Sequence, residues 1–203
     1  MKIKNKNMKR KSLKATSLFI LGLFIVSLTG CGEDPVPVND EEVITTLKLT
    51  FDELDQNLAS TGNPITYSFA DPDGDGGNNP VVDNIVLKAA SVYNVTAELL
   101  NESVTPTVDI TPEITLEGES HQIFYEYVGT GLPVFNYLDF DKNNKPIGVK
   151  KLLYTEFAGS GTLTVTLRHL PDKNAEGVSN GDITNAGGAT DFVTTPAFSV
   201  TIN

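Results

Sequence analysis

The residues best suited to chemistry in this chain are a run of alternating acids and two isolated histidines. Asp71, Asp73 and Asp75 alternate with proline and glycine up to residue 76. This D-x-D-x-D-G pattern is the first half of a calcium loop, in which alternate carboxylates converge on a hard cation and glycine permits the bend. The bidentate Glu that closes such a loop is replaced by Val82, which excludes a helix–loop–helix calcium hand. Calcium between β-strands is the prediction that remains.

A second acidic loop repeats the first at a distance of 68 residues (139 minus 71), with Asp139, Asp141 and Asn143. It is less suited to calcium, because Asn144 replaces the glycine and Lys142 and Lys145 lie beside it. Both loops also fit ordinary solvated hairpin turns, in which Asp, Asn, Gly and Pro are favoured for backbone reasons. Calcium is therefore a candidate for the first loop, with the second as a source of further ligands.

Two histidines offer a different metal chemistry. His121 begins the segment HQIFYEYV, and His169 ends TLTVTLRHL on the face that carries the apolar residues. Two histidines with one or two carboxylates would suit zinc, provided that the two strands are neighbours with both histidines at one edge. The interpretation that the sequence favours is simpler: His169 caps the core through a carbonyl and His121 is solvated, since no short metal-ligand spacing is present. Zinc thus ranks behind calcium as the expected cofactor.

Catalytic patterns are absent from the sequence. Neither histidine accompanies a G-x-S-x-G turn, and Gly159-Ser160-Gly161 lacks its flanks. Acids that share one turn, such as Asp139 and Asp141, lack the separation across a bond that glycoside hydrolysis needs. The absence of tryptophan weakens a carbohydrate platform as well. We therefore expect a protein that is not an enzyme.

The elements that position these residues are predicted to be strands. Apolar residues alternate with polar ones in 95–99, 163–167 and 198–202, which indicates strands with one buried face. Further strands are expected at 43–51, 64–69, 81–88, 121–128, 134–138, 149–157 and 191–195. About ten short strands between Gly, Pro, Asn and Asp turns predict an all-β antiparallel sandwich, Ig-like or related. A single helical turn is expected at Thr111-Pro112-Glu113, with Thr111 as its cap.

An internal duplication is a further prediction. The shift that superimposes the acidic loops also places 95–99 over 163–167, face for face. The few identities between the two segments fit chance similarity between strand–turn–strand units equally well. The duplication, if real, would put two acidic loops at related corners of the sandwich.

The amino terminus predicts export and lipidation. Seven Lys and Arg precede the apolar stretch 18–28, which is too short for a spanning helix and fits a signal peptide. Leu28-Thr29-Gly30-Cys31 resembles the lipobox of bacterial lipoproteins, which implies diacylglyceryl and acyl (palmitate-type) modification of Cys31 and a stable membrane anchor. The expected organisation is a signal peptide at 1–30, a lipidated acidic tether at 31–42 and a β-sandwich domain at 43–203. Gly32-Glu33-Asp34 resembles the export signal of Bacteroidota-type surface lipoproteins, which implies the outer membrane and its outer face.

Charge limits the partners. Eight Lys and Arg stand against 26 Asp and Glu after Cys31, so nucleic acid is excluded as a partner and cations or basic surfaces are favoured. The lone cysteine excludes disulfide frameworks and Cys-based metal clusters.

Several motifs together resemble one group of proteins. The lipobox, the acidic tether, F-x-D-x-D-G-D-G-G at 69–77, H-Q-I-F-Y at 121–125 and L-R-H-L-P-D-K at 167–173 are similar to short Bacteroidota-type lipoproteins, some of which carry the label type 1 periplasmic binding fold superfamily. That label implies a two-lobed α/β fold, whereas the alternation here predicts β-structure alone.

The expected function follows from the predicted localisation and the predicted fold. It is a non-catalytic outer-membrane lipoprotein that binds a ligand, metal ion or partner protein, as an accessory to an outer-membrane receptor. The alternative is a structural or adhesive surface module whose acidic loop is stiffened by calcium.

Overall fold

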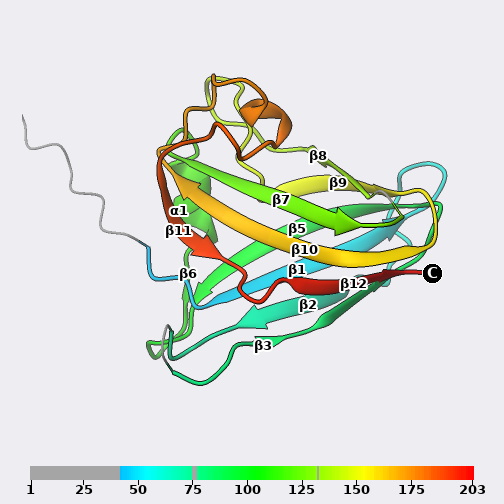
Figure 1. Cartoon of the computed structure of the whole chain (residues 1–203), viewed down its shortest axis with the longest axis horizontal. Helices are drawn as coiled ribbons and strands as arrows, with labels where there is room; N and C mark the ends of the chain where they lie inside the picture. Colours follow the sequence, from blue (N-terminus) through cyan, green and yellow to red (C-terminus); the bar gives the residue numbers. More distant parts are fainter. Residues whose placement is uncertain (1–41, 75–76, 132) are drawn as a thin grey trace, which may run out of the picture. The chain divides into compact units, whose positions relative to one another are not determined.

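The computed structural model describes residues 42–74, 77–131 and 133–203, and within them the chain is an all-β sandwich of two sheets (Figure 1). The predicted fold class is therefore confirmed. The predicted signal peptide, tether and lipidated Cys31 lie outside the described residues, except for Glu42. No helix in the described ranges has the length and apolar character needed to cross a membrane.

The first sheet has seven strands in the order β3-β2-β1-β5-β9-β8, with β6 paired to β5. Their bounds are β1 Thr46–Leu54, β2 Ile65–Ala70, β3 Val81–Val82, β5 Ser91–Asn101, β6 Val108–Asp109, β8 Val134–Tyr137 and β9 Lys150–Thr155. The pairings within this sheet are antiparallel.

The second sheet has five strands and is built around the long strand β10 (Gly159–His169). One edge of β10 pairs with β7 (His121–Gly129), and the other edge pairs with β12 (Phe198–Ile202) in its first half and with β11 (Ala189–Val193) in its second half. β4 (Asn84–Leu87) runs parallel to β12 at the far side. β7 and β11 therefore flank the same end of β10.

The core lies between the sheets and follows the predicted alternation. The residues that alternate inward along the three predicted strands are all buried: Val95, Ala97, Leu99, Leu163, Val165, Leu167, Phe198, Val200 and Ile202. Leu47, Leu49 and Phe51 of β1 complete the same apolar layer. Because every other residue of each strand points into this layer, the register of the sheets is fixed by burial.

The two segments that the duplication would relate form two arches, and the duplication itself stays a prediction. Strand β5 and strand β10 both have 11 residues and begin 68 positions apart (159 minus 91). The strand before each, β4 or β9, lies in the opposite sheet, so each unit crosses the sandwich once. The arches cross in opposite directions, which puts the matched strands 95–99 and 163–167 in different sheets.

The connection from residue 170 to 188 covers the outer face of the second sheet. It contains the short 3₁₀ turn η1 (Val178–Asn180), and its Val178 and Ala186 pack on Phe124 of β7. The start of β7 is consequently buried on both faces.

The predicted helix start is correct in place but not in its cap. Helix α1 spans Thr111–Leu116 and is preceded by Ile110 at the capping position. The Thr111 hydroxyl instead accepts a hydrogen bond from the Leu99 N–H at 2.8 Å. This hydrogen bond attaches the helix to β5. The chain then continues from the end of the helix to His121, the first residue of β7.

Candidate metal centre

The two histidines meet at one end of the second sheet. Strands β7 and β10 are antiparallel neighbours, and His121, the first residue of β7, lies directly opposite His169, the last residue of β10. Their rings pack edge to face with centroids 4.8 Å apart, and His169 Nδ1 lies 3.0 Å from His121 Nε2. The condition that the sequence left open is therefore met. The favoured interpretation of a solvated His121 is wrong, because its side chain is fully buried.

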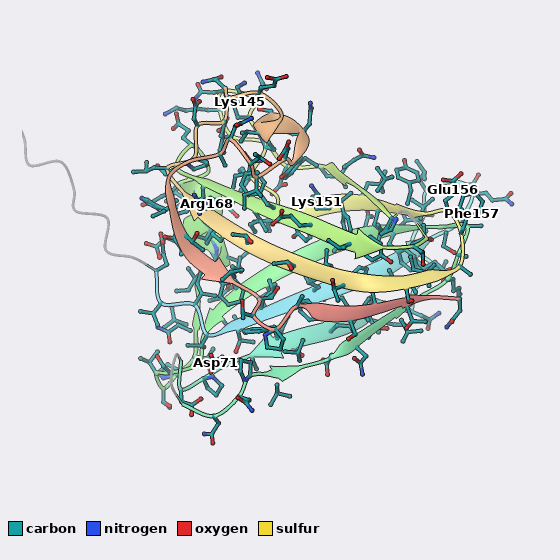
Figure 2. The ribbon with its side chains drawn as sticks, viewed as in Figure 1. Asp71, Lys145, Lys151, Glu156, Phe157 and Arg168 are labelled. Carbon is teal, nitrogen blue, oxygen red and sulfur yellow. The ribbon has the colours of Figure 1, made fainter. Side chains whose placement is uncertain are left out.

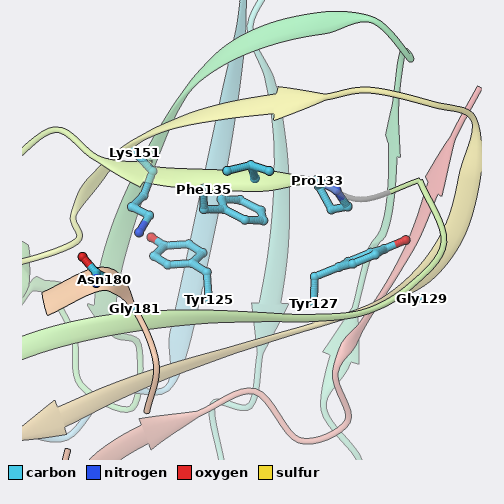
Figure 3. A pocket seen from close by; sticks show the side chains of 9 residues that line it. Tyr125, Tyr127, Gly129, Pro133, Phe135, Lys151, Asn180 and Gly181 are labelled. Atoms are coloured by element: carbon cyan, nitrogen blue, oxygen red, sulfur yellow. The ribbon is translucent and has the colours of Figure 1, made fainter. Parts of the chain in front are cut away.

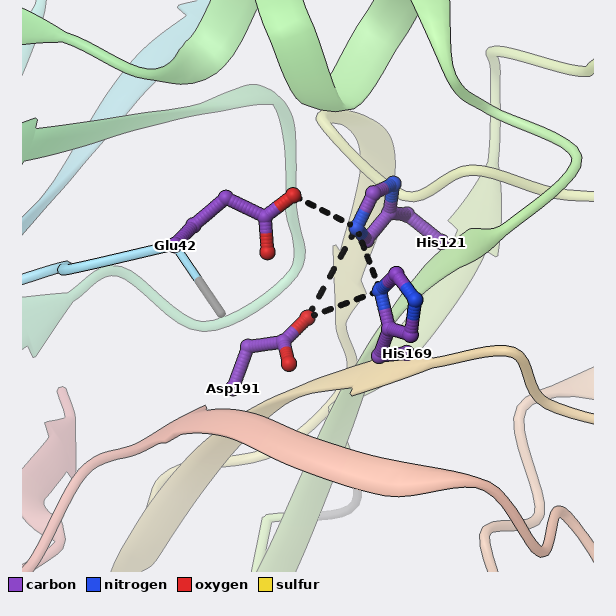
Figure 4. A group of neighbouring side chains, drawn as sticks. All are labelled: Glu42, His121, His169 and Asp191. Atoms are coloured by element: carbon purple, nitrogen blue, oxygen red, sulfur yellow. Dashed lines mark hydrogen bonds and ion pairs between the residues drawn. The ribbon is translucent and has the colours of Figure 1, made fainter. Parts of the chain in front are cut away.

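Asp191 reaches the histidines through an irregularity in β11. The register pairs Leu167 with Phe192 and Arg168 with Thr190, which leaves Asp191 as the extra residue of a β-bulge. Bulges redirect a side chain out of the regular alternation. Asp191 Oδ2 lies 3.5 Å from His169 Nδ1 and 3.6 Å from His121 Nε2 (Figure 4).

The bulge is held by Arg168 and by a close approach of two chain segments. The Arg168 guanidinium donates to the carbonyl oxygens of Gly187 and Gly188 and to Thr190 Oγ1. Gly188 has φ +67°, and a Cβ at this position would overlap the carbonyl oxygen of His169. Only glycine combines that conformation with that approach, so the loop can wrap tightly around the end of β10.

Glu42 enters from the segment that precedes β1. Its Oε1 lies 3.1 Å from His121 Nε2. Thr45 secures the segment, because its N–H donates to the Leu100 carbonyl at 2.9 Å and its hydroxyl accepts from the Glu102 N–H at 2.8 Å. The four side chains thus come from four separate parts of the chain and join the segment before the first sheet to the second sheet.

A backbone carbonyl sets the tautomer of His121. Its Nδ1 lies 3.2 Å from the carbonyl oxygen of Glu117, the residue that caps the C-terminus of α1. A carbonyl oxygen only accepts, so Nδ1 carries the proton and Nε2 presents its lone pair to the cluster. Metal-ligating histidines are oriented by this kind of second contact. Burial also lowers the pKa of His121 and favours the neutral ring.

The four groups converge with a spacing that suits a small metal ion. The side chains of Glu42, His121, His169 and Asp191 are 4%, 0%, 12% and 1% exposed, and one ligand atom from each lies within 4.8 Å of the others. In a tetrahedral site with bonds of about 2.0–2.1 Å, neighbouring ligand atoms are separated by about 3.3 Å. The four measured separations, from 3.0 to 3.6 Å, bracket that value.

The charges of the cluster also call for a cation. The Glu42 carboxylate lies almost completely buried, and a buried charge is costly unless it is paired. Glu42 accepts no hydrogen bond from the described residues, although its Oε1 is close to His121 Nε2. Protonating both imidazoles would place two like charges 3.0 Å apart, which Coulomb repulsion opposes. A single divalent ion would neutralise both carboxylates and leave both rings neutral.

The second acidic loop uses its oxygens for other contacts. Asp139 accepts the N–H groups of Gly148 and Val149 at 2.9 and 2.8 Å. Asp141 accepts the N–H groups of Asn143 and Lys145, and its Oδ2 pairs with buried Lys173 at 3.2 Å. An ammonium group therefore already neutralises this loop.

The first acidic loop lies at a different corner of the sandwich, as the positions of Asp71 and Lys145 show (Figure 2). Asp73 Oδ2 accepts the backbone N–H of Asn78 at 2.8 Å, which lowers the pKa of Asp73. Asp71 has one buried oxygen without a hydrogen bond from the described residues. Asp75 lies outside the described residues, so calcium in this loop stays a prediction.

We expect calcium to leave the second acidic loop unchanged, because backbone N–H groups and Lys173 already satisfy its carboxylates. Addition of about 1 mM calcium, the upper range of extracellular sites, should not shift the backbone amide resonances of residues 141–145. Saturable shifts at these amides would contradict the expectation. Asp73→Ala, which removes an acid from the first loop, separates the two loops in the same spectra.

Sequence reasoning found the histidines and missed both carboxylates. Glu42 stood at the end of the expected tether, and Asp191 at the start of an expected strand. No local spacing connects either acid to a histidine. The acids nearest to His121 in sequence have other roles, since Glu117 contributes its carbonyl and Glu119 pairs with Lys142.

Comparison of the chain with protein-family models, with curated proteins and with solved structures found no match.

Proposed function

We propose that this chain is a surface lipoprotein whose β-sandwich binds one divalent transition-metal ion, zinc in the first place, without catalysing a reaction. The observation that carries the proposal is the convergence of Glu42, His121, His169 and Asp191 at one end of the second sheet. The carboxylates supply two negative charges and the histidines supply two neutral nitrogen donors. This donor set neutralises and coordinates a single divalent ion.

Zinc fits the donor set better than calcium does. Imidazole nitrogen is a good ligand for zinc and neighbouring transition metals, whereas calcium takes six to eight oxygen ligands. The ligand separations agree with a tetrahedral ion, as shown above. The calcium candidates of the acidic loops are distinct from this centre.

A binding role is favoured over catalysis because the site is closed. Catalytic zinc sites keep one position open for water or substrate, whereas sites with four protein ligands hold the metal structurally. Here four protein ligands are available, and three of their side chains are no more than 4% exposed. The ion would connect the segment before β1 to the second sheet.

The cellular setting of the proposal comes from the sequence. The lipobox at Cys31 and the acidic run after it support a lipid anchor in the outer membrane, with the sandwich at the cell surface. An outer-membrane receptor is the partner that such an anchored binding domain would serve. The acidic body favours a basic surface on that partner.

Cobalt(II) and zinc titrations test the site. Residues 31–203 carrying Cys31→Ser should bind one equivalent of cobalt with the intense visible bands of a tetrahedral complex, and zinc should displace it. His169→Gln and Asp191→Asn should each weaken binding at least about 100-fold, the upper range for loss of an outer-shell contact. Glu42→Gln should weaken binding in the same direction, because it removes one of the two negative charges.

Glu119→Gln is the matched control. Glu119 is an exposed acid close to His121 in sequence, but its carboxylate pairs with Lys142. This variant should bind cobalt like the parent protein. A cobalt spectrum that is octahedral, or that survives in His169→Gln, would refute the proposed centre.

A further inference from the structure

A second cavity opens between the edge strands of the two sheets, away from the metal cluster. It has a volume of about 350 Å³ and lies between β7, β8, β9 and the η1 turn (Figure 3). Tyr125, Tyr127, Phe135, Lys151, Asn180 and Gly181 are among the residues that line it. The volume falls at the lower end of the range for small-molecule sites.

The cavity contains a buried cation. Lys151 is 2% exposed because it faces inward on β9 together with Leu153. Its ammonium lies 3.0 Å from the centroid of the Tyr137 ring and 5.1 Å from that of Tyr125. The contacts of this ammonium with described residues are to these two rings, although an ammonium has three hydrogen-bond donors. Figure 3 shows its amino end directed toward Tyr125 and Asn180.

The nearby carboxylate of Asp139 does not accept hydrogen bonds from this ammonium. Asp139 is the carboxylate whose charge acts on Lys151, and both of its oxygens already accept the backbone N–H groups of Gly148 and Val149. Burial lowers the pKa of Lys151 from 10.5 to about 7. An anion that entered the cavity would supply both the missing charge and the missing acceptors.

The walls around the cation are flat and apolar. The rings of Tyr125 and Phe135 stack with centroids 5.3 Å apart and an interplanar angle of 22°. The Tyr125 hydroxyl donates to the Gly148 carbonyl and the Tyr127 hydroxyl to that of Thr130. Because these hydroxyl protons are already used, the tyrosines present mainly their ring surfaces to a ligand.

We propose that this cavity is a binding site for a small organic carboxylate with a flat apolar body. The carboxylate would accept hydrogen bonds from Lys151, and its body would lie along the wall formed by Tyr125 and Phe135. This site is independent of the proposed metal centre, because the two share no residue.

Calorimetric titration with benzoate tests the proposal. At pH 8 the parent protein should bind benzoate with uptake of protons, because the anion raises the pKa of Lys151. Titrations in two buffers of different ionisation enthalpy measure that uptake. Lys151→Met should weaken binding at least about 10-fold, the effect of losing a hydrogen bond to a charged group.

Two further variants make the test specific. Lys150→Met removes the exposed neighbouring lysine and should leave benzoate binding unchanged. Asn180→Asp places a carboxylate at the exposed rim and should weaken binding through repulsion. The far-UV circular dichroism spectrum of each variant reports whether the sandwich has folded, independently of the cavity and of the metal centre.

The competing outcomes are distinct. Saturable benzoate binding that is equal in Lys151→Met, or that takes up no protons, would overturn the assignment of Lys151. No binding of benzoate up to about 10 mM, a range that detects weak complexes, would overturn the site. If inorganic phosphate binds as tightly as benzoate, the cavity is a general anion site. That result would refute the claim that the ligand has an apolar body.

Discussion

Removal of the metal should lower the midpoint of thermal unfolding of the sandwich by about 8–16 °C. A ligand present at about 1,000 times its Kd stabilises the native state by about 4 kcal/mol, provided that the unfolded chain does not bind it. For a domain of this size each kcal/mol corresponds to about 2–4 °C. The measurement is a thermal melt of residues 31–203 carrying Cys31→Ser, after chelation and again after zinc is added back.

The stabilisation should disappear as the pH falls. Zinc needs neutral imidazoles and ionised carboxylates, so protons compete with the metal. In the metal-free protein, burial lowers the pKa of His121 below its ordinary value of 6.5. The unfolded chain then binds the proton more readily, so acidification below about 6.5 favours unfolding even without metal. The zinc-dependent gain should therefore be large at pH 7.5 and small at pH 5.

His169→Gln and Glu119→Gln form the matched pair for this experiment. Zinc should no longer raise the midpoint of His169→Gln, whereas Glu119→Gln should respond like the parent protein. Equal melts with and without zinc in the parent protein would contradict the metal centre. If calcium raises the unfolding midpoint as much as zinc does, and still does so in His169→Gln, the metal would be calcium bound in the first acidic loop.

The fold was predictable because the buried face of a β-strand is visible in its own sequence, as an alternation of apolar and polar residues. The alternation in 95–99, 163–167 and 198–202 identified the inward faces of β5, β10 and β12, and all the apolar residues involved are buried. Strands β3 and β6 have two residues each, which is too few for an alternation of apolar and polar residues to be visible in the sequence. Strand order depends on contacts between distant parts of the chain, so it could not be predicted from alternation.

The site was predictable only in part, because its ligands are set by tertiary structure. The sequence predicted that His169 points inward, because it lies an even number of residues from Leu163, Val165 and Leu167 on the same strand. The pairing of His169 with His121 required the β7–β10 neighbourhood, which the sequence gives no means to choose. Asp191 points to the histidines because of a bulge, and a bulge shifts the alternation on which the prediction depends.

Glu42 illustrates the limit most clearly. It lies in a run of Pro and acids that has the composition of a solvated tether, and it is one of 26 Asp and Glu in the chain. Its partner His121 is distant in sequence, and their contact depends on how the segment before β1 meets the end of the second sheet. Composition reports the average behaviour of such a run, not the one residue that is held in place.

Lys151→Met should stabilise the protein at pH 6, by about 1–4 kcal/mol, the range observed when buried ion pairs are replaced by apolar side chains. Burial lowers the pKa of Lys151 from 10.5 to about 7. That difference corresponds to at most about 5 kcal/mol, and the cation–π contact with Tyr137 offsets part of it. Urea unfolding of the two proteins measures the change directly.

The pH dependence distinguishes this cause from better packing. Because the folded pKa is lowered, the unfolded chain binds the proton of Lys151 between about pH 7 and 10.5 while the folded chain does not. The stability of the parent protein should therefore rise with pH through this window. The advantage of Lys151→Met should shrink over the same window, because the amine of the folded parent protein is then neutral. Lys150→Met should show no such trend, since its lysine is exposed.

A stabilising effect at this position would also bear on the second site. Alternation places Lys151 on the inward face of β9 with Leu153 and Thr155, where an apolar residue would ordinarily stand. A cation that lowers stability and whose contacts with the described residues are to aromatic rings is the kind of feature that function, rather than folding, retains. If Lys151→Met is instead destabilised by the same amount at pH 6 and pH 10, the aromatic contacts outweigh the cost of burial. Lys151 would then be a structural residue, and the carboxylate site would lose its main support.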